Sequence, residues 1–204
     1  MAAGNVQRFR PRARLLPLLG DQLIRDARLA VFELVKNSYD ADASRVTVLL
    51  ERVASPESGR IVVSDDGEGM DYTTVTNVWL EPGTDYRTLQ REHGVRTARH
   101  HRLPLGEKGV GRFAAHKLGR RIRLTTRSAG QTEVTVDIDW DELATNEYLD
   151  QVSVKVLQRK PERFTGRATG TEIEVRSLRE PWTRSSVRNL YRSVASISSE
   201  IGTP

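Results

Sequence analysis

The chain has 204 residues, of which 37% are hydrophobic and 29% charged, with a net charge of +5 and a pI near 9.8. This length fits one domain with a sizeable core, and no apolar run approaches the ~18 residues of a membrane span. The absence of cysteine excludes disulfides and thiolate metal sites, and no N-terminal apolar stretch suits a secretory signal. We therefore expect a cytoplasmic protein that does not bind a membrane.

An amphipathic helix is predicted over residues 21–39, after a short arm formed by residues 1–20. The apolar residues recur at spacings of three and four: Leu23, Ile24, Ala27, Val31, Leu34 and Val35. Asp21 is the expected N-cap. Glu33 and Asn37, four residues apart, lie together at the margin of the apolar stripe. A carboxamide can bind a hard cation and a carboxylate can polarise water, although a solvated Glu and a helix-terminal Asn would explain this pair as well.

The remaining elements predict an α+β fold, with a layer of helices over a mostly antiparallel mixed sheet. Strands at 45–53 and 61–64 form a hairpin, and a short helix follows at 73–80. Residues 81–104 are polar and aperiodic, which predicts a mobile lid. A helix at 112–118, strands at 121–127, 133–140, 152–158 and 171–176, and a last helix from about residue 183 complete the prediction.

A first glycine-rich turn contains Asp65, Gly67, Gly69 and Met70, directly after a predicted buried strand. Its glycines would let the backbone approach a flat ligand, and a carboxylate at a strand end can accept a hydrogen bond from an exocyclic amine such as that of adenine. A simple acidic turn is the competing interpretation.

A second glycine cluster contains Gly106, Lys108, Gly109, Val110 and Gly111, at the start of a predicted helix. Exposed backbone N–H groups and the positive end of a helix favour phosphate, and Lys108 adds a full charge. The cluster does not match the Walker pattern, and a glycine loop by itself is weak evidence.

A third piece, Thr169 to Thr171, stands directly before the last predicted strand. Its hydroxyls could contact a polar ligand or cap a turn, and by itself the turn is the simpler interpretation. The order of all the pieces along the chain changes this weighting. The pair on the helix comes first, the acidic turn second, the cluster at 106–111 third and Thr171 last.

In this order the sequence resembles the ATP-binding domain of the GHKL superfamily, which includes gyrase, heat-shock chaperone, histidine kinase and MutL proteins. The resemblance covers about residues 20–180. It implies the two-layer α/β sandwich of the Bergerat type, in which ATP lies between helices and sheet under a lid at about 81–111. The implied organisation is an arm at 1–20, the ATP-binding domain at 21–180, and a C-terminal helix at 181–204 that leads into a missing downstream region.

The resemblance also implies roles for individual residues. Glu33 corresponds to the general base and Asn37 to the Mg²⁺ ligand, so ATP and Mg²⁺ are the expected cofactors. Asp65 would accept the hydrogen bond of the adenine amine. Gly67, Gly69, Met70 and Thr171 would support that end of the site, whereas Gly106, Lys108, Gly109, Val110 and Gly111 would wrap the phosphates.

Residues 37–41, Asn-Ser-Tyr-Asp-Ala, resemble the hydrolysing branch of gyrase, MutL, chaperone and MORC proteins. This favours a Mg²⁺-dependent ATPase whose lid closure or homodimerisation, driven by nucleotide, switches a larger protein. Residues 20–24 bear a looser likeness to large prokaryotic ATPases of the superfamily. In the gyrase and MutL branch, a lysine from a following domain usually completes the γ-phosphate site. Because this chain ends at Pro204, we expect slow turnover from it alone.

Two alternative functions remain open at this stage. A histidine-kinase catalytic domain would transfer the γ-phosphate of ATP to a histidine of another protein. A nucleic-acid-binding module would use arginines in and after the lid, although a solvated basic surface explains them more simply. These arginines are Arg91, Arg96, Arg99, Arg102, Arg112, Arg120, Arg121 and Arg123.

Overall fold

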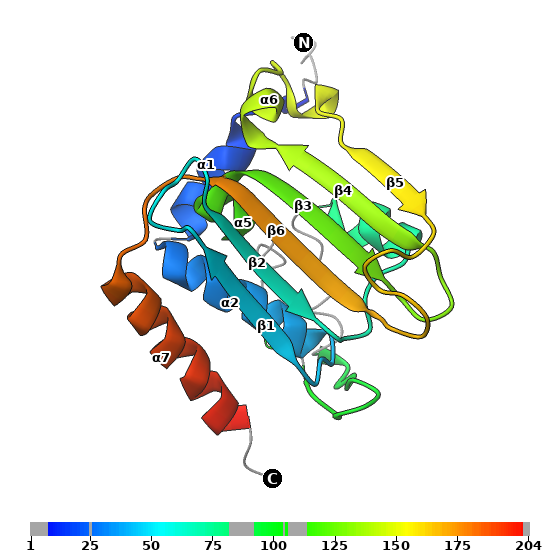
Figure 1. Ribbon diagram of the computed structural model, residues 1–204. Coiled ribbons are helices and arrows are strands. Elements are labelled where there is room, and N and C mark those ends of the chain that lie inside the picture. Colours follow the sequence, from blue (N-terminus) through cyan, green and yellow to red (C-terminus); the bar gives the residue numbers. More distant parts are fainter. Residues whose placement is uncertain (1–7, 25, 82–91, 104, 106–113, 202–204) are drawn as a thin grey trace, which may run out of the picture.

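The computed structural model describes residues 8–24, 26–81, 92–103, 105 and 114–201. Its central feature is a sheet of six strands in this part of the chain, in the order β1-β2-β6-β3-β4-β5 with every neighbouring pair antiparallel. The strands are β1 (Val46–Glu51), β2 (Arg60–Asp65), β3 (Gly119–Arg127), β4 (Glu133–Asp139), β5 (Lys155–Arg159) and β6 (Gly170–Leu178). Figure 1 shows α2 lying across one face of this sheet, which confirms the predicted α+β class.

The helices of the described residues are α1, α2, α3, α5, α6 and α7, with short π- and 3₁₀-helical turns. Their bounds are α1 (Leu15–Leu23), α2 (Ala27–Asp40), α3 (Tyr72–Thr74), α5 (Ala114–Leu118), α6 (Trp140–Ala144) and α7 (Arg184–Ile201), with π-helix η1 (Val75–Trp79) and 3₁₀-helix η3 (Leu149–Gln151). None of the helices described is long and apolar enough to cross a membrane.

The prediction of one helix over residues 21–39 with Asp21 as its N-cap is wrong. Asp21 lies inside α1, which occupies part of the predicted arm, and α2 begins after Asp26. Asp26 has an extended backbone, and its carboxylate accepts a hydrogen bond of 2.7 Å from the backbone N–H of Arg28. A carboxylate at the N-cap satisfies an N–H group that has no partner within the helix, which is why α2 starts there.

The hydrophobic core lies between α2 and the helix-covered face of the sheet. Ile61, Val175 and Ile122 are opposite one another on adjacent strands and are buried. Val31 and Leu34 of α2 are also buried in this core. Because side chains alternate along a strand, the intervening residues point to the other face.

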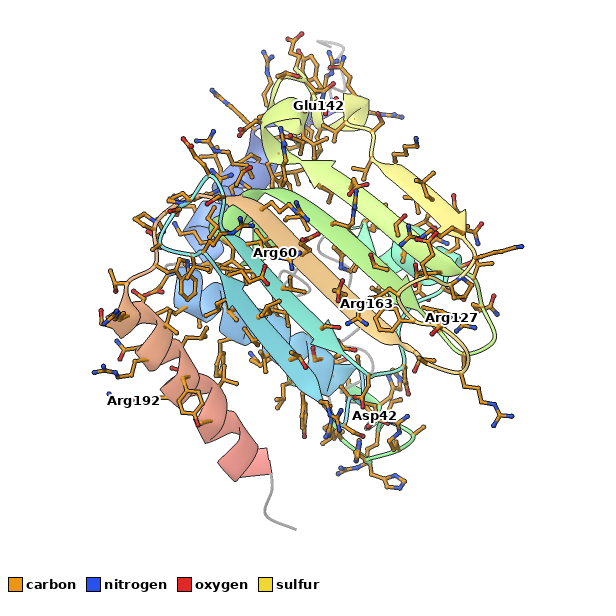
Figure 2. The ribbon with its side chains drawn as sticks, in the orientation of Figure 1. Asp42, Arg60, Arg127, Glu142, Arg163 and Arg192 are labelled. Carbon is orange, nitrogen blue, oxygen red and sulfur yellow. The ribbon has the colours of Figure 1, made fainter. Side chains whose placement is uncertain are left out.

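The open face of the sheet, visible in Figure 2, carries rows of charged side chains. Arg60, Arg176, Arg121 and Asp139 are opposite one another across β2, β6, β3 and β4. Arg121 and Arg123 bind carboxylates of β4, and Arg120 lies 3.5 Å from a carboxylate oxygen of α6. The arginines that motivated the nucleic-acid alternative in β3 therefore have carboxylate partners. Arg91 and Arg112 lie outside the described residues.

Candidate functional site

The carboxylate of Asp65, at the C-terminal end of β2, connects three of the predicted pieces. Its Oδ2 accepts a hydrogen bond of 2.9 Å from the hydroxyl of Ser38 in α2. Its Oδ1 accepts hydrogen bonds from the backbone N–H of Gly67 at 3.0 Å and of Thr171 at 3.1 Å. The helix, the acidic turn and the start of β6 thus meet at one side chain.

The same carboxylate has a perturbed protonation equilibrium. Burial raises the pKa of Asp65 above its ordinary value, and the hydrogen bonds from Gly67, Ser38 and Thr171 oppose this effect without cancelling it. Burying an ionised carboxylate in this way lowers the stability of the fold, so stability does not explain why Asp65 is there. Such groups are concentrated at functional sites.

Two glycines allow the backbone on either side of Asp65 to pack without a gap. Gly69 has a φ of 64°, and a Cβ atom there would lie 2.0 Å from the carbonyl oxygen of Arg127. Gly170 has a φ of 144°, and a Cβ atom there would lie 2.0 Å from the carbonyl oxygen of Asp65. No side chain fits at either position, so the acidic turn, the end of β3 and the start of β6 are held in direct backbone contact.

Thr126 of β3 also contacts the residues around Asp65. Thr126 is fully buried, and its Oγ1 accepts a hydrogen bond of 2.9 Å from the backbone N–H of Met70. The same hydroxyl lies 3.0 Å from the carbonyl oxygen of Gly170 and 3.0 Å from the hydroxyl of Thr171. Thr126 therefore fixes Met70 and Thr171 relative to each other.

The loop between β5 and β6 is anchored by one arginine and one glutamate. The Nη1 of Arg127 donates to the carbonyl oxygens of Phe164 at 2.7 Å, Gly166 at 2.8 Å and Ala168 at 3.2 Å. Glu133 is fully buried and accepts hydrogen bonds from the backbone N–H of Phe164 at 2.9 Å and from the Arg159 side chain. Burial opposes ionisation of Glu133, but these hydrogen bonds hold its pKa below the ordinary value.

This anchored loop ends at the site. Thr169 follows Ala168 and donates a hydrogen bond of 2.7 Å from its hydroxyl to the carbonyl oxygen of Gly67. The order imposed by Arg127 and Glu133 therefore extends to the backbone of the acidic turn. The hydroxyl of Thr169 therefore stabilises a turn, which is the simpler of the two interpretations drawn from the sequence.

Glu33 and Asn37 lie on the margin of α2, as the helical periodicity predicts. Glu33 is half-buried and Asn37 is exposed, whereas the neighbouring Leu34 and Ser38 are buried. The carboxylate of Glu33 lies 3.1 Å from the ammonium group of Lys36, an ion pair that the sequence reasoning did not anticipate. Because Ser38 binds Asp65, the end of α2 that carries Asn37 is tied to the acidic turn.

The structure brings together Asp65, Gly67, Gly69, Met70 and Thr171. The predicted phosphate-binding residues Gly106, Lys108, Gly109, Val110 and Gly111 lie outside the described residues. Sequence reasoning missed Ser38, Thr126 and Arg127. Ser38 had a usable signal, because it continues the apolar stripe four residues after Leu34 and is a polar residue at a buried position.

Gly69→Ala is expected to lower the free energy of unfolding by about 3 kcal/mol or more, because a Cβ at positive φ adds strain and also collides with backbone. Gly130→Ala is the matched control. Gly130 has a φ of 74°, but a Cβ there would meet nothing within 4 Å. The control should lose only about 1–2 kcal/mol. Urea unfolding of both variants measures the difference, and equal losses would refute the close contact at Gly69.

The helix-covered sheet of six antiparallel strands is consistent with a GHKL-type ATPase domain. A sequence model described as histidine kinase-, DNA gyrase B-, and HSP90-like ATPase matches residues 26–171. The chain belongs to this family. Glu33, Asn37, Asp65 and Thr171 all lie within the matched residues.

Among characterised proteins, the chain is similar to the Chaperone protein HtpG of Gluconobacter oxydans (strain 621H). The two are 32% identical over 137 residues, which covers 59% of this chain and 22% of that protein. The chain thus spans less than a quarter of the length of this relative. The family relationship supports ATP binding and chemistry of the ATP-hydrolysis type for the chain.

Proposed function

We propose that this chain is a Mg²⁺-dependent ATP-binding and ATP-hydrolysing module that switches a larger protein. The observation that carries the proposal is the carboxylate of Asp65, which is joined to Ser38, Gly67 and Thr171 from three separate parts of the chain. These contacts fix the carboxylate in place. A fixed, partly buried carboxylate is suited to accept a hydrogen bond from the adenine amine.

At this end of the site, Asp65 selects adenine, and Gly69 supports it by letting the acidic turn pack directly on the backbone of Arg127 and Gly170. Gly67, Met70 and Thr171 hold the walls through the contacts described above. GTP carries a carbonyl where ATP carries the amine, so a carboxylate acceptor would face another acceptor. The proposed site therefore prefers ATP to GTP.

At the phosphate end, Asn37 is the proposed protein ligand of Mg²⁺. Among the described residues, no cluster of three His, Asp or Glu side chains could hold a metal ion. The single carboxamide oxygen of Asn37 fits Mg²⁺, which usually keeps water and substrate phosphates as most of its ligands. Bound Mg²⁺ would supply neutralisation of phosphate charge. Glu33 orients a water molecule and accepts its proton as the water oxygen bonds to the γ-phosphorus and ADP leaves.

The proposed domain runs over residues 21–180, with residues 1–20 as an arm and 181–204 as a C-terminal helix connecting to downstream domains. Gly106, Lys108, Gly109, Val110 and Gly111 are the proposed phosphate loop at the end of a lid at about 81–111. Lid closure or homodimerisation on ATP binding would carry the signal, and release of ADP and phosphate would reset it.

Calorimetric titration with a non-hydrolysable ATP analogue tests this proposal directly. We expect saturable binding that weakens when Mg²⁺ is removed with a chelator, and binding of the corresponding GTP analogue that is at least about tenfold weaker. A folded chain that binds neither analogue would refute the proposal. Equal affinity for both would refute the role of Asp65 in selecting the base.

A further inference from the structure

The turn that follows α2 contains a residue with an uncommon backbone conformation. Asp42 has a φ of 61° and is almost completely buried. Residues other than glycine rarely adopt this left-handed conformation, although Asp and Asn tolerate it best. Glycine would fill the position without strain, so an aspartate there points to a use for its side chain. Figure 2 shows Asp42 at the end of the sheet where α2 and β1 meet.

The carboxylate of Asp42 binds the turn formed by residues 97–102. Its Oδ1 accepts hydrogen bonds from the hydroxyl of Thr97 at 2.7 Å and from the backbone N–H of His100 at 3.1 Å. Its Oδ2 accepts one from the backbone N–H of Arg99 at 2.5 Å. These contacts connect positions more than fifty residues apart in the sequence. Together, they satisfy the backbone N–H groups of Arg99 and His100 with a buried charge.

Arg102 makes a second attachment between the same two parts of the chain. Its Nη1 donates to the carbonyl oxygen of Ala43 at 2.7 Å, and its guanidinium carbon lies 4.4 Å from the centroid of the Tyr39 ring. The 97–102 turn is also closed on itself, because the N–H of Thr97 donates to the carbonyl oxygen of Arg102. It is therefore a preformed unit held at both ends.

A third contact continues this attachment toward the predicted phosphate loop. The backbone N–H of Leu105 donates a hydrogen bond of 2.7 Å to Oδ1 of Asp40, which is itself buried. Leu105 directly precedes Gly106 in the sequence. At the C-terminal end of α2, Asp42 and Asp40 therefore accept hydrogen bonds from backbone N–H groups before and after Arg102.

The residues on either side of Asp42 and Ala43 bind the acidic turn of the candidate site. The carbonyl oxygen of Ala41 accepts a hydrogen bond of 2.8 Å from the N–H of Glu68. The N–H groups of Ser44 and Arg45 each donate a hydrogen bond of 2.8 Å to Oδ1 of Asp66. The short stretch around Asp42 is therefore bound on one side to the adenine end of the site and on the other to the 97–102 turn.

We propose that Asp42 is a positioning residue that keeps the 97–102 turn docked beside the nucleotide site and thereby slows nucleotide release. This inference rests on the proposed function, because it assigns a determinant of how long ATP stays bound. Asp42 does not contact the reacting atoms. It acts through the turn that it binds.

Asp42→Gly tests the inference, because glycine keeps the backbone conformation and removes only the carboxylate. We expect a fluorescent ATP analogue to dissociate about tenfold faster from the variant in a stopped-flow chase with unlabelled ATP, since hydrogen bonds to a charged acceptor are lost. Thr97→Val removes one donor from the other partner and should give a smaller increase. In the double variant, any increase beyond that of Asp42→Gly alone reports the hydrogen bond from the Arg102 N–H to the Thr97 hydroxyl, which does not involve Asp42.

Ser177→Gly is the matched control. Ser177 has a φ of 51° in β6, so this change relieves the same kind of backbone strain without touching the 97–102 turn. Its release rate should equal that of the parent. Hydrogen exchange at the amides of Arg99 and His100, which donate to Asp42, should accelerate only in Asp42→Gly.

The outcomes separate this inference from the proposed function. If the parent does not bind the ATP analogue, the proposed function fails and the inference about release fails with it. If the parent binds and a folded Asp42→Gly variant releases the analogue within twofold of the parent rate, only the positioning role of Asp42 is overturned. Accelerated exchange of Arg99 and His100 together with faster release would support it.

Discussion

Glu33→Ala is expected to lower the rate of ATP hydrolysis by about 100-fold or more, because loss of a general base typically costs that much. ATP affinity should stay within about threefold of the parent, since Glu33 is proposed to act on water rather than on the nucleotide. Single-turnover measurement of phosphate release, with calorimetry for affinity, separates the two effects. An unchanged hydrolysis rate would remove Glu33 from the mechanism.

The ion pair between Glu33 and Lys36 requires a control for this experiment. The two charged groups lie 3.1 Å apart, so Glu33→Ala also leaves Lys36 without that partner. Lys36→Met breaks the same ion pair and keeps the carboxylate. If hydrolysis depends on the base, Lys36→Met should lose far less activity than Glu33→Ala. Equal losses would mean that the ion pair, and not the base, supports the reaction.

Asp65→Asn is expected to weaken ATP binding by about 100-fold, because the amide would lose the charged acceptor and can present an N–H group to the adenine amine. The variant should be at least as stable as the parent. Its amide oxygen can still accept from the N–H groups of Gly67 and Thr171, and no charge is buried. Inorganic triphosphate should bind both proteins equally, and an equal loss for ATP and triphosphate would contradict the assignment.

The raised pKa of Asp65 gives this prediction a pH dependence with a definite sign. Its value in the folded chain lies above the unfolded value of about 3.8, so ionised Asp65 weakens the fold as pH rises through the folded pKa. Adenine binding needs the ionised form, so it should fail as pH decreases through that raised pKa. Inorganic triphosphate lacks the adenine base, so a loss of affinity at low pH that ATP shows and triphosphate does not show belongs to the adenine end. Asp65→Asn should lack this ATP-specific loss, because its side chain does not titrate.

Hydrophobic periodicity was sufficient to predict the sheet but not the start of the main helix. The predicted strands 45–53 and 121–127 coincide with β1 and β3 to within three residues. The apolar pattern runs through Ile24 without interruption, yet Ile24 is an extended and buried residue between α1 and α2. Periodicity reports burial and not backbone conformation at such a position.

A similar limit explains the missed helix α6. Trp140 continues the buried alternation of β4 and was predicted as strand, but it is the first residue of α6. The chain changes from strand to helix at Asp139, because the carboxylate of this residue caps α6 by accepting hydrogen bonds from the N–H groups of Asp141 and Glu142. Such a cap is visible in the sequence only as one more aspartate.

The site was predictable where residue type and spacing carry the chemistry, as for Asp65 and its glycines. Its supporting contacts were not, because they join residues far apart in the sequence. Thr126 reaches Met70 across 56 positions, and Arg127 reaches the loop at Phe164 across 37 positions. Such residues meet only once the strands have taken their order in the sheet, and the pattern of one segment does not say which other segments become its neighbours.

The edge strand β5 has a bearing on how copies of this chain can associate. It ends the sheet opposite β1, and Lys155 and Arg159 stand on the same face of the strand as Leu157. If two molecules joined their β5 edges into one continuous sheet, Lys155 of one copy would approach the cations of the other across the new ladder. Arg159 is paired with Glu133 and Glu162 in its own chain, so Lys155 contributes most of the repulsion. The β5 edge is therefore disfavoured as a place for two copies of the chain to join into one continuous sheet.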